Sequence, residues 1–238
     1  MSNNIKSDEA SDLPRGTAQS DGRRTFLKAG GGAAALLTLG AVAATNAPFA
    51  LAQTTGEVDL GTGDMGIANY TFLLERLEAA FYTQVINTPF AGMTAEERQI
   101  LTDIRDHEII HREFIRAALG PRAISGVLNA QFNFSRINFS DRTSVLTTAQ
   151  IFEDTGVAAL NGAGQLIGST DILVLAGKIA SVEGRHAAAI RDLRYPRTNF
   201  FAPHAADEAL DPPTVLTAVS PFIQTPISGR NLPTITTV

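Results

Sequence analysis

Residues 108–111 read Glu-Ile-Ile-His, and residues 183–186 read Glu-Gly-Arg-His. Residues three apart lie on the same face of a helix, so each pair can direct a carboxylate and an imidazole toward one metal ion. The chain has only 4 histidines, and two of them follow a glutamate at this spacing. The repeated motif predicts a metal site shared by two helices. The alternative is two ordinary ion pairs on exposed helix surfaces.

Both motifs fall in the middle of predicted helices. Hydrophobic residues at helical spacing predict four helices, over about residues 64–87, 94–120, 142–168 and 171–195. Asp64 is expected to cap the first helix, and Thr94 to Glu97 has the form of a capping box for the second. The third helix contains glycines, which weaken the prediction there.

Loop lengths predict the arrangement of these helices. Short turns at residues 88–93 and about 168–170 favour two antiparallel hairpins. The connection 121–142 is long enough to run back along the bundle. We therefore predict an all-α, four-helix bundle over residues 64–195, with one long crossover between its second and third helices. A linker at 53–63 precedes it, and a proline-rich tail at 196–238 is expected to wrap around it.

The first and third helices must supply further carboxylates to complete a buried metal site. Residues equally distant from a hairpin turn lie at the same depth. Glu75 lies about as far before the first turn as Glu108 lies after it, whereas Glu78 would be displaced by about 6 Å along the helix at 1.5 Å per residue. Glu75 is therefore the better candidate, and Glu78 is a competing ligand or a neighbour of the ligands.

The same comparison around the second turn places Glu153 close to the level of Glu183. His107 has no glutamate three residues before it and is expected beside the ligands or at the surface. His204 lies in the tail and is expected in solvent. The sequence does not single out a redox-active tyrosine. The predicted metal ligands are Glu75, Glu108, His111, Glu153, Glu183 and His186.

One glutamate from each of two helices, with Glu-x-x-His from each of the other two, is the ligand pattern of ferritin-like di-iron and di-manganese proteins. The sequence resembles that superfamily. Residues 74–82 (LERLEAAFY) and 106–112 (DHEIIHR) are similar to a bacterial ferritin-like domain related to plant desiccation-related proteins. The resemblance implies two iron or manganese ions, each held by one Glu-His motif, with Glu75 and Glu153 as terminal or bridging ligands.

The first 52 residues have the features of an export signal. Arg23 and Arg24 are followed by Phe26-Leu27-Lys28, an uncharged run rich in Ala, Gly and Leu, and a small–x–small cleavage site ending at Ala52. The arginine pair resembles a twin-arginine (Tat) signal. It implies passage through the Tat translocase, cleavage near residue 52 and a periplasmic or extracellular location. A general secretory signal or an uncleaved membrane anchor is the alternative.

Composition excludes several classes of function. The absence of cysteine excludes disulfides, thiolate metal sites and a rubredoxin-type electron-transfer centre. The net charge of −5 gives no basic excess, which argues against nucleic-acid binding. We expect no membrane attachment after cleavage. The sequence leaves a homo-oligomer open but specifies no 24-subunit shell.

Three functions therefore remain. The first is an exported di-metal redox protein that acts on O2, peroxide or Fe(II), with ferroxidase, peroxidase or catalase-like activity. The second is a stress- or desiccation-related bundle that binds metal without turnover. The third is a structural bundle that binds no metal.

Overall fold

The computed structural model describes residues 56–235. The arginine pair, the apolar run and the cleavage site at Ala52 lie outside the described residues, so the export signal stays a prediction. Among residues 56–235, no helix combines the length and the apolar character needed to cross a membrane.

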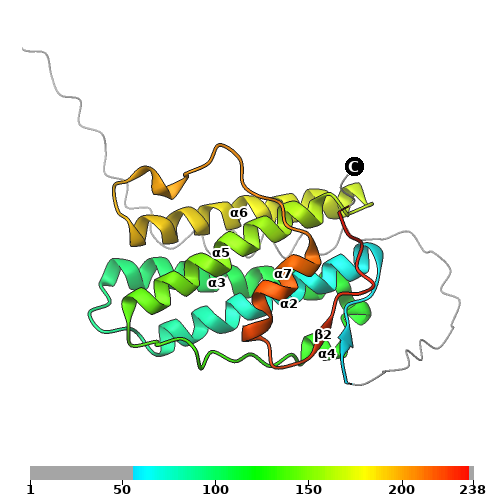
Figure 1. Ribbon diagram of the computed structural model, residues 1–238, viewed down its shortest axis with the longest axis horizontal. Helices are drawn as coiled ribbons and strands as arrows, with labels where there is room; N and C mark the ends of the chain where they lie inside the picture. The colour runs from blue at the N-terminus through cyan, green and yellow to red at the C-terminus, as the bar shows by residue number, and fades with distance from the viewer. Residues whose placement is uncertain (1–55, 236–238) are drawn as a thin grey trace, which may run out of the picture. The chain divides into compact units, whose positions relative to one another are not determined.

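Four long helices form the body of the protein, and Figure 1 shows how they are arranged. They are α2 (Gly63–Asn87), α3 (Ala95–Leu119), α5 (Arg142–Gly164) and α6 (Thr170–Arg194). Helix α2 packs mainly against α3, and α5 packs mainly against α6. The predicted all-α class, with two helical hairpins joined by a long crossover, is confirmed. The third helix ends at Gly164, four residues earlier than predicted.

Local hydrogen bonds explain where these helices begin. At α3 the capping box is present: Thr94 Oγ1 accepts from the Glu97 N–H, and the Glu97 carboxylate accepts from the Thr94 N–H. Asp141 caps α5 by accepting from the Ser144 N–H. Ser169 caps α6 by accepting from the Ile172 N–H.

Asp64 does not cap α2, and this prediction was wrong. Thr62 holds the cap position without a side-chain hydrogen bond. The Asp64 carboxylate instead accepts from the backbone N–H groups of Gly168 and Ser169, at 2.8 and 2.9 Å. These residues form the turn between α5 and α6, so Asp64 ties the start of one hairpin to the turn of the other.

The crossover and the tail both pack against the bundle. The crossover contains a 3₁₀ turn, η1 (Gly120–Arg122), and a short helix, α4 (Ser125–Leu128). The tail contains η2 (Asn199–Phe201), α7 (Pro212–Val219), η3 (Ser220–Phe222) and β2 (Ile227–Ser228). Strand β2 pairs in parallel with β1 (Val58–Asp59), with Val58 opposite Ile227. Part of the predicted linker is therefore a strand.

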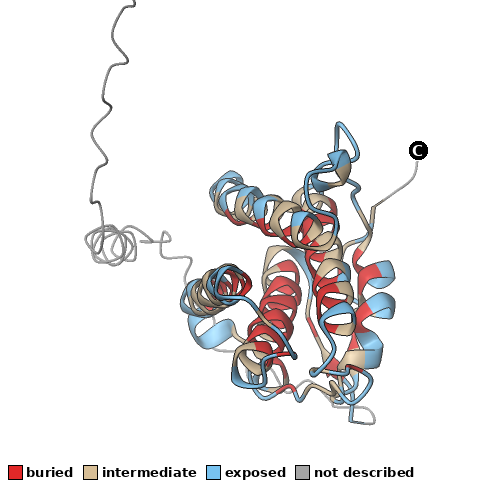
Figure 2. Ribbon diagram, turned by 90° about the vertical axis from the view of Figure 1, so that its left-hand side faces the viewer, coloured by how far each residue is buried: buried red, intermediate tan, exposed pale blue. Residues whose placement is uncertain are grey.

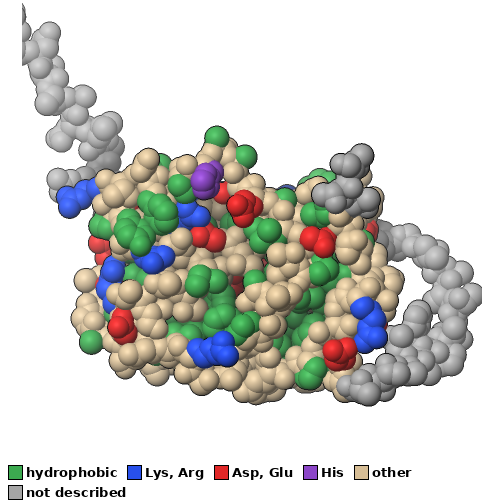
Figure 3. Space-filling model, viewed as in Figure 1, with side chains coloured by type: hydrophobic (Ala, Val, Ile, Leu, Met, Phe, Trp, Pro, Cys, Tyr) green, Lys and Arg blue, Asp and Glu red, His purple; other side chains and the backbone are tan. Residues whose placement is uncertain are grey.

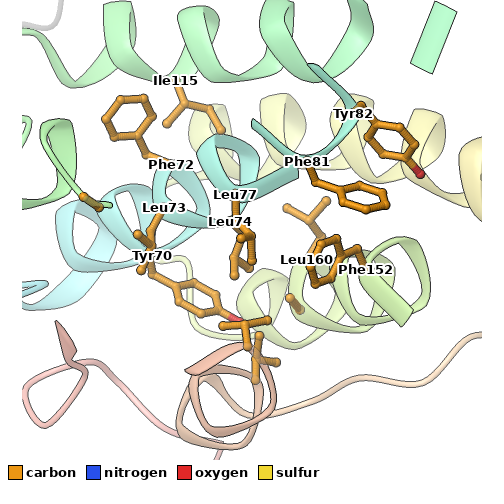
Figure 4. Packing of buried hydrophobic residues seen from close by; sticks show 14 of the residues in the cluster. Tyr70, Phe72, Leu73, Leu74, Leu77, Phe81, Tyr82, Ile115, Phe152 and Leu160 are labelled. Carbon is orange, nitrogen blue, oxygen red and sulfur yellow. The ribbon is translucent and has the colours of Figure 1, made fainter. Parts of the chain in front are cut away.

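Hydrophobic side chains fill the space between the helices, and the buried faces point inward (Figure 2). Phe81 of α2 makes an edge-to-face contact with Phe152 of α5, with ring centroids 5.1 Å apart (Figure 4). This apolar packing is interrupted by a set of buried acidic and imidazole side chains from all four long helices.

Candidate metal centre

The structure brings all six predicted ligands together inside the bundle. They form two overlapping groups that could each hold a metal ion, and within each group one ligand atom per residue lies within 4.8 Å of every other. All six side chains are buried. The first group is Glu75, Glu108, His111 and Glu183, and the second is Glu108, Glu153, Glu183 and His186.

The two glutamates of the Glu-x-x-His motifs each reach both histidines. Glu108 Oε1 lies 2.8 Å from His186 Nδ1, and its Oε2 lies 3.6 Å from His111 Nδ1. Glu183 Oε1 lies 2.8 Å from His111 Nδ1, and its Oε2 lies 3.3 Å from His186 Nδ1. Both carboxylates therefore lie between the two imidazoles.

The other two glutamates each lie near one histidine. Glu75 Oε2 is 3.4 Å from His111 Nδ1, and Glu153 Oε2 is 3.6 Å from His186 Nδ1. The result is a two-fold arrangement, with Glu75 beside one imidazole and Glu153 beside the other.

The hydrogen bonding of the cluster fits a site for a cation. Eight buried nitrogen and oxygen atoms of the cluster have no hydrogen-bond partner of suitable geometry among the described residues, although His Nδ1 and Glu oxygens lie as close as 2.8 Å. Leaving a buried polar atom unpaired costs about 1–3 kcal/mol. Four carboxylates also match the charge of two divalent ions. The unpaired atoms are Glu75 Oε2, His111 Nδ1, Glu153 Oε2, His186 Nδ1 and both carboxylate oxygens of Glu108 and Glu183.

The close packing of buried carboxylates and imidazoles also shifts the pKa values of the cluster. Burial, with the charge of Glu108 adding to it, raises the pKa of Glu153 to about 8 against the opposing effect of His186. Burial would lower the pKa of His186, but the surrounding carboxylates outweigh it and raise that pKa to about 12. Burial would likewise raise the pKa of Glu108, but the two imidazoles hold it at about 2. Without metal, protons supply the positive charge that the cluster needs.

Glu78 lies beside the cluster, in neither group. Its side chain is buried, and burial followed by the charges of Glu108 and Glu183 raises its pKa well above the usual range. A Cβ atom added at Gly156 would lie 3.0 Å from Glu78 Oε1, so this glycine provides space for the carboxylate. No such role is found for Gly184, because a Cβ atom there would meet nothing within 4 Å.

Glu78 lines two small cavities, each of about 10 Å³. Phe152 of α5 and Val219 of α7 line one of them, and Glu75 and Glu183 line the other. Figure 3 shows hydrophobic side chains gathered in the hollowed middle of the face on which α5 and α7 lie. Each cavity has room for about one water molecule.

Two contacts to the cluster were not identified from the sequence. Tyr82 Oη donates to Glu153 Oε1 at 2.5 Å, and burial raises the pKa of Tyr82 well above its usual range. Its spacing of seven residues from Glu75 places both on one face of α2, which is the signal that could have found it. His107 was expected beside the ligands or at the surface. It is exposed, and its Nδ1 lies 2.9 Å from His186 Nε2.

A ferritin-like domain is matched over residues 63–196, a range that contains the four long helices and all six clustered ligands. No curated protein matches the chain.

Proposed function

Because the chain belongs to the ferritin-like domain family, we propose that it binds two iron or manganese ions and acts on O2, peroxide or Fe(II). The observation that carries the proposal is the set of eight buried ligand atoms without hydrogen-bond partners. Two divalent ions would satisfy these atoms and balance the four carboxylates. Mixed carboxylate and imidazole ligands suit iron and manganese, which accept more ligands than zinc.

The positions of the side chains suggest how the ions are shared. Glu75 and His111 would hold one ion, Glu153 and His186 would hold the other, and Glu108 and Glu183 would serve both. When bound, iron or manganese supplies electron exchange with O2 or peroxide. Tyr82 holds Glu153 Oε1, which leaves Oε2 facing His186.

The surroundings of the cluster indicate the size of its substrate. Leu74 and Leu160 line the cavity that opens toward Glu75 and Glu183, and that cavity has a volume of about 10 Å³. Such a space accommodates a molecule about as large as water. This favours O2, peroxide or a metal ion over an organic substrate.

Metal analysis tests the binding proposal. We expect about two iron or manganese ions per chain in protein purified without chelators, and none in a double variant carrying Glu108→Ala and Glu183→Ala. Circular dichroism would establish that the double variant is helical. A wild-type protein that carries no metal and takes up none from Fe(II) or Mn(II) would overturn the proposal.

Turnover is tested on the loaded protein. The iron form should consume O2 with Fe(II), or peroxide, and the manganese form should dismutate peroxide. Two bound ions without any consumption would instead support the alternative, a stress- or desiccation-related bundle that only binds metal.

We also propose that the protein is exported by the Tat translocase and released near residue 52. Arg23, Arg24 and the apolar run after them support this. Replacing both arginines by lysine should hold the precursor in the cytoplasm, and the exported protein should have the mass of residues 53–238. Export of the double-lysine variant at the wild-type level would contradict a Tat route.

A further inference from the structure

A second imidazole contacts one histidine of the cluster from outside. His107 immediately precedes Glu108 on α3, and its Nδ1 lies 2.9 Å from His186 Nε2. The two rings are nearly parallel, at 15°, with centroids 5.1 Å apart. His107 is exposed, whereas His186 is 4% exposed. The contact therefore joins a buried ligand to the protein surface.

The atoms involved determine what this contact can do. His186 Nδ1 faces Glu108, Glu153 and Glu183. If Nδ1 binds a metal ion, the neutral ring must carry its proton on Nε2, where it can only donate. His107 Nδ1 lies at hydrogen-bond distance and can accept a hydrogen bond from Nε2. The hydrogen bond would hold the His186 ring in the orientation and tautomer that metal binding needs.

The other half of the cluster has no equivalent group at the corresponding position. Val182 precedes Glu183 on α6 as His107 precedes Glu108 on α3. An aliphatic side chain neither donates nor accepts a hydrogen bond. The near two-fold symmetry of the six ligands is therefore broken in the residues just outside them.

We propose that His107 is a positioning residue for His186 and that it makes the two ion positions unequal, with the tighter ion beside Glu153 and His186. This inference rests on the proposed dinuclear site. Hydrogen-bond partners of metal-binding histidines typically contribute about 10- to 100-fold to metal affinity. The wild-type protein should therefore bind two ions in two separable steps.

Calorimetric titration of the metal-free mature protein with Mn(II) tests this. His107→Ala should weaken the tighter step by about 10- to 100-fold and leave the weaker step unchanged. His107→Asn should restore much of that affinity, because its Oδ1 can accept at the place of Nδ1. His204→Ala, in the exposed tail, is the matched control and should bind like wild type.

Two further variants identify the affected position. Glu153→Gln should weaken the same step as His107→Ala. The double variant should lose less binding free energy at that step than the sum of the losses in the two single variants. Glu75→Gln should weaken the other step. A purely structural role of His107 would affect both steps alike and would lower the melting temperature of the metal-free protein.

The outcomes separate this inference from the proposed function. If His107→Ala binds both ions like wild type, or weakens both steps equally, the positioning role is wrong although the dinuclear site stands. If His107→Asn behaves like the alanine variant, the accepted hydrogen bond is not the cause. If the wild-type protein binds no Mn(II) or Fe(II), the proposed function itself fails, and the inference fails with it.

Discussion

Tyr82 of α2 donates a hydrogen bond to Glu153 of α5, and both side chains are fully buried. The bond joins the two helical hairpins beside the proposed metal centre. It occupies one oxygen of Glu153, and the other oxygen faces His186. Tyr70, on the same helix, has an equally buried hydroxyl that has no partner among the described residues. The two tyrosines therefore form a natural comparison.

Tyr82→Phe should lower the free energy of unfolding of the metal-free protein by about 1–3 kcal/mol, because Glu153 Oε1 would lose its donor. Tyr70→Phe removes a hydroxyl that is buried without a partner, so it should be neutral or stabilising. Urea denaturation followed by circular dichroism measures both changes. Equal destabilisation by the two substitutions would show that ring packing, and not the Tyr82 hydrogen bond, is responsible.

Glu75 and Glu78 provide a second matched pair. Both are buried on α2, but only Glu75 has an oxygen within the clustered groups. Glu75→Gln should therefore lower the metal content toward one ion per chain or weaken one binding step by more than tenfold. Glu78→Gln should keep two ions. Elemental analysis after gel filtration measures the number of metal ions per chain. Loss of an ion from the Glu78→Gln variant would show that Glu78 is also a ligand.

The sequence predicted the members of this cluster because helices are rigid and hairpins have a fixed register. Counting from the turns was enough to prefer Glu75 over Glu78 and to select Glu153. It could not show which histidine each motif glutamate faces, since residue spacing determines a helix face and not the contacts across the bundle. Glu108 and Glu183 reach both histidines only because α3 and α6 meet at that level.

Asp64 also shows that the sequence pattern does not reveal contacts between distant parts of the chain. Its place near the start of α2 fits a local cap, but its carboxylate binds two backbone N–H groups from a turn about 100 residues later. The parallel pairing of β1 with β2 is likewise a long-range contact between short segments. No periodic pattern in the sequence predicts such long-range contacts.

Asp64→Ala should destabilise the protein by about 1 kcal/mol, within the range of about 0.5–1.5 kcal/mol that a typical hydrogen bond contributes. The substitution leaves two backbone N–H groups at the α5–α6 turn without their carboxylate acceptor. Asp207→Ala, in the exposed tail, is the control and should change stability by less than about 0.5 kcal/mol. Thermal unfolding of both variants measures the difference, and a neutral Asp64→Ala would show that water replaces the carboxylate without cost.

The metal-free protein should lose thermal stability as the pH rises from 5 to 9. Burial raises the pKa of Glu153 from 4.5 to about 8, and the carboxylates around His186, against burial, raise its pKa from 6.5 to about 12. A raised pKa means that the folded state holds the proton more tightly than the unfolded state. The stability that such a group contributes is complete below its pKa in the unfolded state. It is lost as the pH rises through its pKa in the folded state.

The pKa of Glu108 is lowered to about 2, so Glu108 contributes stability that is lost only as the pH falls below about 4.5. This contribution stays constant between pH 5 and 9. Metal ions displace the protons, so the stabilisation by Mn(II) should grow with pH over the same interval. Melting temperatures of chelator-treated and Mn(II)-saturated protein, measured at pH 5, 7 and 9, should therefore diverge. Glu153→Gln should flatten the metal-free curve. A metal-free melting temperature that rises between pH 5 and 9 would show that the cluster does not hold these protons.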